Sequence, residues 1–242
     1  MAGNAAYDWD SFDSGDYLEH NYADLHDEDR KILNIVRDFL CSQSFDSNTR
    51  GVDVGTGTNL YPALAMLPFC REIDLLEFSE ANRIWLADQL NDYSANWDSY
   101  WKVLTKQDVY RSVERPRERL RRHTTVREWD ILDSVPEVKW DVGTMFFVAE
   151  SITTFREEFT TALGKFCALL KPGAPFAMTF MENSKGYEVG GKPFPALGIG
   201  VADVQDEMEE LGNGLGFHHV NIGAQPLREG YSGMILAHGY VK

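Results

Sequence analysis

Short apolar stretches alternate along the chain with segments in which apolar residues recur at helical spacing. Five apolar stretches are expected to form strands, at residues 51–54, 73–77, 125–129, 140–148 and 176–181. Helices are expected before, between and after them, at residues 24–41, 60–67, 79–90, 97–122, 154–170 and 202–211. Two further strands are expected near 217–223 and 233–241. Such an alternation predicts a mostly parallel α/β sheet.

Local signals mark where several of these elements begin or end. Pro62 suits the first turn of its helix, and Ser79 is a typical N-cap. Pro116 is expected to interrupt the helix at 97–122. Residues 1–23 look irregular and are rich in aromatic and acidic side chains, and residues 182–198 look like a Gly/Pro-rich loop.

The placement of these elements narrows the fold class. A long segment, residues 1–48, precedes the sheet, and the last two strands look like a hairpin. A dehydrogenase sheet usually begins near the N-terminus, so both features favour a seven-stranded Rossmann-like methyltransferase sheet. We expect it to be mostly parallel, with an antiparallel terminal strand and an N-terminal helical cap. The chain would then be one domain over 1–242, with a cap at 1–48, a core at 49–242 and a substrate loop near 182–198.

Charge argues against a nucleic-acid substrate. The formal net charge is −15, from 23 basic and 38 acidic residues. Binding to nucleic acid depends largely on Lys and Arg that neutralise phosphates. The one basic run, residues 115–123, is short and is expected to be a solvated helix face. We therefore expect a small-molecule acceptor, with a monomer or weak homodimer as the working form.

The remaining composition indicates a cytoplasmic protein without a metal. The three cysteines have no metal-binding spacing, so buried free thiols are expected. The six histidines form no ligand-spaced set on one helix. The first residues are acidic and lack the apolar core of a signal peptide, and no window approaches 18 consecutive apolar residues. Neither export nor a membrane span is expected.

The strongest chemical signal is the sequence Val52-Asp53-Val54-Gly55-Thr56-Gly57, a strand followed by a glycine turn. Glycines there let the backbone approach a ligand at the carboxyl edge of a sheet. Leu60 stands where a dinucleotide fingerprint has its third glycine, beside the pyrophosphate. S-adenosylmethionine (SAM) has no pyrophosphate, so the incomplete motif suits SAM better than NAD.

Two acids follow the next two strands. Glu77 ends the second strand, where a carboxylate can accept both ribose hydroxyls of a nucleoside. Asp130 follows the third strand and can accept a hydrogen bond from an adenine amino group. The carboxyl ends of parallel strands share one edge, so these acids and the glycine turn are expected to form one ligand site.

Five stretches of the sequence together resemble the nicotinamide, phenylethanolamine and indolethylamine N-methyltransferase family, a group of SAM-dependent enzymes. They are Asp16–Tyr22, Gly55–Tyr61, Glu77–Asn82, Trp129–Ile131 and Leu169–Gly173. They are similar to the family patterns D-Y-L-x-x-Y-Y, G-S-G-P-T-I-Y, D-Y-S-x-x-N, C-D-V and L-L-K-P-G. The resemblance runs from about Asp8 to Lys242.

The resemblance implies residues that bind SAM and its product S-adenosylhomocysteine (SAH). Two tyrosines would close over the cofactor, the glycine loop would approach it, and the acids would hold its ribose and adenine. The expected residues are Tyr17, Tyr22, Gly55, Thr56, Gly57, Asn59, Tyr61, Glu77, Phe78, Asn82, Asp130, Ile131 and Phe146.

On the acceptor side, residues 181–190 are similar to the family's M-D-x-x-x-S-x-Y-Y-x-x-G, so Glu182 and Tyr187 would face the acceptor. Glu150, at the rim after the fourth strand, is a further candidate. The sequence departs from the family at Asn21, which replaces the first tyrosine of the Y-Y pair, and it is one residue shorter before Tyr187. The resemblance therefore carries the cofactor further than the acceptor.

The reaction implied is an in-line methyl transfer, for which the protein supplies alignment and exclusion of water. A neutral amine acceptor needs a carboxylate, Glu182 or Glu150, to orient it and receive its proton. An uncharged ring nitrogen needs no base. The aromatic N-terminus favours a flat aromatic or heteroaromatic acceptor.

Other functions remain open at this point. Transfer to oxygen, sulfur or carbon fits the same fold, because function depends on the site. An NAD(P)-dependent oxidoreductase shares the glycine loop and the acid after the second strand. A catalytically silent SAM-binding partner protein is a further alternative, with the acidic helix at 202–211 as its contact face.

Overall fold

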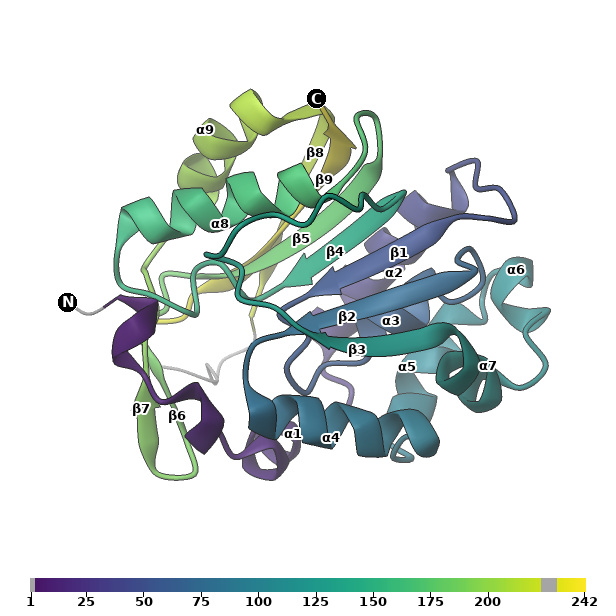
Figure 1. Cartoon of the computed structure of the whole chain (residues 1–242), viewed down its shortest axis with the longest axis horizontal. Coiled ribbons are helices and arrows are strands. Elements are labelled where there is room, and N and C mark those ends of the chain that lie inside the picture. Colours follow the sequence, from purple (N-terminus) through teal and green to yellow (C-terminus); the bar gives the residue numbers. More distant parts are fainter. Residues whose placement is uncertain (1–2, 223–229) are drawn as a thin grey trace.

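The computed structural model of the chain describes residues 3–222 and 230–242. Seven of its strands form one sheet in the order β3-β2-β1-β4-β5-β9-β8 (Figure 1). Strands β1 to β5 are parallel, and β9 runs antiparallel between β5 and β8. The predicted fold class is thereby confirmed. The bounds are β1 Arg50–Val54, β2 Glu72–Glu77, β3 Thr124–Glu128, β4 Val142–Phe146, β5 Pro175–Glu182, β8 Gly212–Asn221 and β9 Gly233–Val241.

Helices cover both faces of the sheet (Figure 1). Apolar side chains of α2, α3 and α5 form one core with the sheet, and those of α8 and α9 form a second core on the other face. The bounds of the longer helices are α2 Asp27–Cys41, α3 Tyr61–Met66, α4 Glu80–Asn91, α5 Trp97–Leu104, α8 Arg156–Leu169 and α9 Val201–Leu211. Except for α5, each lies within a few residues of its predicted range.

The sequence explains why two of these helices form where they do. Helix α2 has acidic side chains in its first turn, where they interact favourably with the positive end of the helix dipole. It buries Ile32, Val36 and Leu40 along one side. Ser79 caps α4, because its hydroxyl oxygen accepts a hydrogen bond from the N–H of Asn82 at 3.3 Å. The predicted role of Ser79 is therefore confirmed.

The N-terminal segment is more regular than predicted. Residues 1–23 were expected to be irregular, but α1 spans Ser14–Tyr22, and two short 3₁₀ helices lie at Asn4–Ala6 and Trp9–Ser11. The cap of α1 is Asp13, whose carboxylate accepts the N–H of Asp16 at 3.0 Å. The covered positions of α1 form one stripe, Ser14, Tyr17, Leu18, Asn21 and Tyr22, but Ser14 and Asn21 are polar, so the apolar spacing of a helix is incomplete in the sequence.

The expected helix at 97–122 is instead three helices, α5, α6 (Asp108–Arg111) and α7 (Pro116–His123). Pro116 does not interrupt a helix but begins α7, where its missing N–H costs nothing because that position has no intrahelical partner. The basic run at 115–123 is this helix, with the ion pairs Arg115–Glu118 and Arg122–Glu118 along it.

Three strand predictions also need correction. The loop expected at 182–198 contains a small hairpin, β6 (Tyr187–Val189) and β7 (Lys192–Phe194). Strand β4 is shorter than the predicted 140–148. Strand β8 begins at Gly212, before the predicted 217, and the predicted end at 223 lies outside the described residues.

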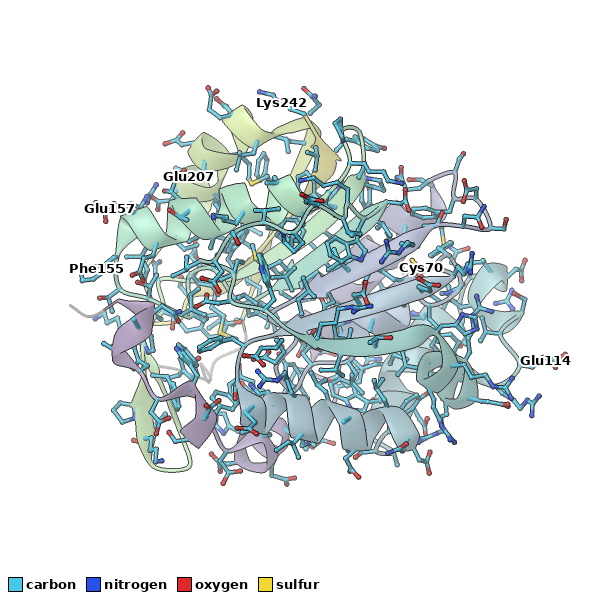
Figure 2. All side chains as sticks on the ribbon, in the orientation of Figure 1. Cys70, Glu114, Phe155, Glu157, Glu207 and Lys242 are labelled. Carbon is cyan, nitrogen blue, oxygen red and sulfur yellow. The ribbon has the colours of Figure 1, made fainter. Side chains whose placement is uncertain are left out.

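The side chains in Figure 2 distinguish the interior from the surface. Cys70 lies within the fold, whereas Glu114 and Glu157 point outward. The three cysteines are free thiols, and burial raises the pKa of Cys70 to about 12. In the described part of the chain, no helix is both long and apolar enough to cross a membrane.

Candidate functional site

A cavity lies at the carboxyl edge of the sheet, where β1, β2, β3 and β4 end. Its walls are the loops after these strands, the N-terminal segment before α1, α1 itself and the start of the β6–β7 hairpin. In Figure 1 the N-terminal segment and this hairpin lie side by side at one end of the sheet. The cavity thus occupies the place where open α/β sheets bind ligands.

The glycine turn after β1 has the left-handed conformation that favours glycine. Gly55 has φ of 63° and Gly57 has φ of 54°. A Cβ atom at Gly55 would also lie 2.6 Å from a side-chain methyl of Val148, which belongs to the loop after β4. Glycine is therefore required at position 55 for two reasons, and the bare backbone of the turn faces the cavity.

Glu77, the last residue of β2, is held beside this turn. One carboxylate oxygen accepts the N–H of Gly57 at 2.7 Å, and the other accepts the N–H of Ser79 at 2.8 Å. Burial raises the pKa of Glu77, and these hydrogen bonds oppose the rise. An ionised carboxylate offers about four acceptor positions. The side chain of Asn82 also hydrogen-bonds to Glu77, so about one position remains for a ribose hydroxyl.

The loop after β3 adds a second acid and an apolar surface. Asp130 lines the cavity with Trp129 and Ile131, and its carboxylate accepts the N–H of Leu132 at 2.8 Å. Asn82, on α4, also lines the cavity and accepts a hydrogen bond from the hydroxyl of Ser14 at 2.8 Å. We call the residues after β1, β2 and β3, namely Gly55, Thr56, Gly57, Asn59, Glu77, Phe78, Asn82, Asp130 and Ile131, the cofactor half.

Aromatic rings from two distant segments cover the opposite side of the cavity. Phe12 lies 5.1 Å from Tyr17 between ring centroids, Tyr17 lies 6.1 Å from Tyr187, and Tyr187 stacks on Phe194 at 5.6 Å. Trp9 completes the group at 5.2 Å from Phe194. We call these five residues, Trp9, Phe12, Tyr17, Tyr187 and Phe194, the roof cluster.

Three polar contacts attach the N-terminal segment to the rest of the molecule. Asp16 accepts the N–H of Gly190 in the hairpin at 2.8 Å, and Asp10 accepts the N–H of Glu80 at the start of α4 at 2.7 Å. The N–H of Asn4 donates to Glu158 of α8 at 2.8 Å. The segment therefore spans the cavity from α8 to α4.

The structure brings together all but one of the cofactor residues expected from the sequence. Tyr61 is the exception, because it lies beneath the cavity floor instead of lining it. Its hydroxyl donates to Asp29 at 3.3 Å and its ring stacks on Tyr100 at 5.5 Å. The others line the cavity: Tyr17, Tyr22, Gly55, Thr56, Gly57, Asn59, Glu77, Phe78, Asn82, Asp130, Ile131 and Phe146.

The three expected acceptor-side residues are placed differently from one another. Tyr187 lines the cavity, and its hydroxyl donates to the carbonyl of Ser151 at 3.3 Å. Glu150 is buried behind the lining, where its carboxylate accepts the N–H of Met181 at 2.9 Å and the hydroxyl of Ser151 at 3.1 Å. Ser151 itself lines the cavity, so Glu150 is one side chain away from it.

Glu182, the last residue of β5, lies outside the lining, and its side chain reaches across β9 to β8. One oxygen of its carboxylate lies 2.9 Å from Nε2 of His219 and 2.5 Å from the hydroxyl of Ser232. Partial burial acts to raise the pKa of Glu182, but the hydrogen bonds from Ser232 and His219 hold it below its usual value. The pairing with His219 was not foreseen from the sequence, because it depends on the register of β8.

Sequence reasoning missed Asn4, Ser151 and Ile152 as lining residues. Ser151 and Ile152 follow Glu150 at the predicted rim, so their position was a usable signal. Phe147 lines the cavity with φ of 60°, a conformation that non-glycine residues rarely adopt. Strain of this kind clusters at functional sites. Within residues 3–222 and 230–242, no group of three or more His, Cys, Asp or Glu side chains could hold a metal ion.

Comparisons with known proteins agree with this geometry. Residues 2–231 match the model of the NNMT/PNMT/TEMT family. The N-methyltransferase NodS from Bradyrhizobium japonicum WM9, solved with SAH, has a similar structure, with a TM-score of 0.55 and 13% identity over 96% of this chain and 94% of NodS. The glycopeptide N-methyltransferase MtfA with SAH has a TM-score of 0.54 and 12% identity over 87% and 90%. No match was found among curated proteins.

Proposed function

The chain belongs to the NNMT/PNMT/TEMT family of SAM-dependent methyltransferases, and on that premise we propose that it methylates a nitrogen of a small aromatic or heteroaromatic acceptor. One observation carries the proposal: a single cavity has the cofactor half on one side and the aromatic roof cluster on the other. The first side suits a nucleoside and the second suits a flat ring.

The residues of the cofactor half fit SAM. Glu77 retains an acceptor position for a ribose hydroxyl, Asp130 offers an acceptor for the adenine amino group, and the turn at Gly55–Gly57 leaves room for the rest of the molecule. Bound SAM supplies an activated methyl group on a sulfonium. The protein then needs to align the acceptor nitrogen and exclude water.

The roof cluster supports an aromatic acceptor. Rings of Tyr17 and Tyr187 lie 6.1 Å apart between centroids at 68°, so their faces offer offset and edge contacts to a flat ring. Among the described residues that line the cavity, none is Lys, Arg or His, so nothing there would neutralise an anionic acceptor. The acceptor is therefore neutral or cationic before transfer.

The placement of the acids favours a nitrogen that carries no proton to be removed, such as a heteroaromatic ring nitrogen. Glu182 is engaged with His219 and Ser232, and the carboxylates on the cavity wall, Glu77 and Asp130, belong to the cofactor half. An amine acceptor would instead need Glu150, acting through Ser151. We therefore propose a different role for each acceptor-side residue. Tyr187 contacts the acceptor, Glu150 is the candidate base for an amine, and Glu182 is held by His219 and Ser232.

A screen with methyl-tritiated SAM tests the function. We expect transfer to heteroaromatics with an unprotonated ring nitrogen, and NMR of the product should place the methyl group on that nitrogen. Transfer to oxygen, sulfur or carbon, or binding of SAM without turnover of any acceptor in the panel, contradicts the proposal. The first outcome favours another methyltransferase specificity and the second a silent SAM-binding protein.

Two substitutions then assign the acids. For a ring-nitrogen acceptor, Glu150→Gln and Glu182→Gln should both retain kcat within about threefold, with Glu188→Gln on the exposed face of the hairpin as the matched control. For an amine acceptor, the loss of a general base should lower kcat by about a hundredfold or more. A large loss in only one variant identifies that acid as the base.

A further inference from the structure

Asn4 is a buried polar residue of the N-terminal segment that lines the cavity. It is 6% exposed and begins the first 3₁₀ helix. Its main-chain N–H donates to Glu158 at 2.8 Å, and its carbonyl accepts the indole N–H of Trp9 at 3.1 Å. Both main-chain groups are therefore satisfied by the protein itself.

The side chain of Asn4 is different. Over residues 3–222 and 230–242, no group hydrogen-bonds to its carboxamide. Its carboxamide atoms keep some accessible surface, although the residue as a whole is nearly buried. The two main-chain hydrogen bonds hold Asn4 at the wall of the cavity, so the carboxamide is left available for a ligand there.

The neighbours of Asn4 associate it with the acceptor side. Trp9, which donates to its carbonyl, packs on Phe194, and Phe194 stacks on Tyr187. The ribose and the adenine of the cofactor have partners of their own in Glu77 and Asp130. Asn4 therefore adds a hydrogen-bonding group to a surface that is otherwise aromatic.

We propose that Asn4 is a specificity-determining residue, whose carboxamide hydrogen-bonds to an uncharged polar substituent, such as a hydroxyl or an amide, on the aromatic acceptor. The inference rests on the proposed function above. A carboxamide both donates and accepts, so it matches a neutral polar group. A site that hydrogen-bonds a substituent discriminates strongly against the analogue that lacks it.

Calorimetry on the SAH-loaded protein tests the proposal without turnover. The ligands are matched pairs of heteroaromatics that differ only in one hydroxyl or amide, for example pyridine and 3-hydroxypyridine, followed by the acceptors found in the screen. We expect the wild type to prefer the substituted member of a pair. Asn4→Leu roughly keeps the side-chain volume and removes both hydrogen-bonding atoms. It should weaken the affinity for the substituted member about tenfold and leave the affinity for the other member unchanged.

Three controls make the result decisive. Asn91→Ala removes an asparagine whose amide donates to Ala87 on exposed α4, and it should change neither affinity. Asn4→Ala repeats the test with a smaller side chain, and circular dichroism melting shows that both Asn4 variants are folded. SAM and SAH should bind each of them with wild-type affinity.

Several outcomes would overturn the inference. Weaker SAH binding by Asn4→Leu would assign the residue to the cofactor. If Asn4→Leu weakened the affinity for both members of a pair equally, Asn4 would have only a packing role. If the wild type bound both members equally well, there would be no discrimination for Asn4 to explain. These results are separate from failure of the proposed function, which is read from the methylated atom of the product.

Discussion

The two sides of the cavity are built in different ways. The cofactor half consists of residues that directly follow neighbouring parallel strands, so strand register alone places Gly55, Glu77 and Asp130 at one edge. The roof is built from side-chain contacts between segments far apart in sequence, such as the hydrogen bond from Gly190 to Asp16 across 174 positions. One side is therefore part of the sheet, whereas the other is attached to it.

This difference separates what each side can do. Changing the cofactor half strains the backbone at the sheet edge, because its turns and hydrogen bonds continue the strands. Changing the roof removes ring contacts and a few surface hydrogen bonds, which the sheet does not need for its own stability. We therefore expect substitutions in the cofactor half to affect binding most and substitutions in the roof to act moderately, through closure over the ligand.

The largest effect is expected from Gly55→Ala. The new Cβ meets Val148 at 2.6 Å, and φ of 63° is strained for alanine, so the turn or the loop after β4 must move. SAM affinity measured by calorimetry should fall by a hundredfold or more, that is about 3 kcal/mol.

Gly173→Ala is the matched control for Gly55→Ala. Gly173 has a similar φ of 77°, but a Cβ there would meet nothing within 4 Å, and it lies at the far end of the sheet before β5. It should lose about 1 kcal/mol of stability from strain and bind SAM normally. If Gly55→Ala also bound SAM normally, the turn would not be part of the cofactor half.

A smaller effect is expected in the roof. Tyr17→Ala removes the ring that contacts Phe12 and Tyr187, so the cover over the cavity loses its central member. SAM affinity should fall by about tenfold, with little change in the melting temperature, because the sheet remains intact. The measurement is calorimetry with SAM and with SAH.

Tyr7→Ala serves as the control for Tyr17→Ala. Tyr7 contacts Trp9 at 6.1 Å between ring centroids but does not line the cavity. It should leave SAM affinity near that of the wild type. Unchanged affinity in Tyr17→Ala would refute the assignment of this tyrosine to the cofactor site.

The same contrast explains what the sequence could predict. The strands and the glycine turn could be predicted because each depends on a local pattern. A strand of this sheet is an apolar run, and the turn needs glycine at a fixed position. Acids after β2 and β3 could be placed together because parallel strands share an edge. Helix α1 and the β6–β7 hairpin were missed. The N-terminal segment and the hairpin pack on each other at Phe12, Val189 and Phe194, and this long-range contact leaves no local pattern in the sequence.

Long-range contacts also limited the prediction of the site. Tyr61 follows the glycine loop in sequence, but its hydrogen bond to Asp29 of α2 draws it under the floor. Glu182 matches the family motif, yet its partner His219 lies on β8, two strands away. Asn4 has no motif around it, and only the docking of its segment on Glu158 brings it to the cavity.

The last expected effect is on the pH dependence of stability and concerns a buried acid beneath the cofactor half. Asp53, on β1, accepts a hydrogen bond from the hydroxyl of Thr144 at 2.6 Å, and burial raises its pKa from 3.8 to about 7. Between these values the folded protein keeps a proton that the unfolded chain has lost. Stability therefore falls as pH rises from about 4 to above 7.

Asp53→Asn keeps the hydrogen bond from Thr144 and removes this titration. Relative to the wild type, the variant should gain stability between pH 4 and pH 8, by about 4 kcal/mol, in urea unfolding followed by circular dichroism. Asp29, also raised to about 7 by burial, remains in the variant, so part of the wild-type slope should persist. Asp88→Asn, on exposed α4, controls for the loss of one charge and should follow the wild-type curve. If the free energy of unfolding of Asp53→Asn and of the wild type changed in parallel with pH, Asp53 would not be protonated in the folded protein. The pH dependence would then arise from other groups, such as Asp29.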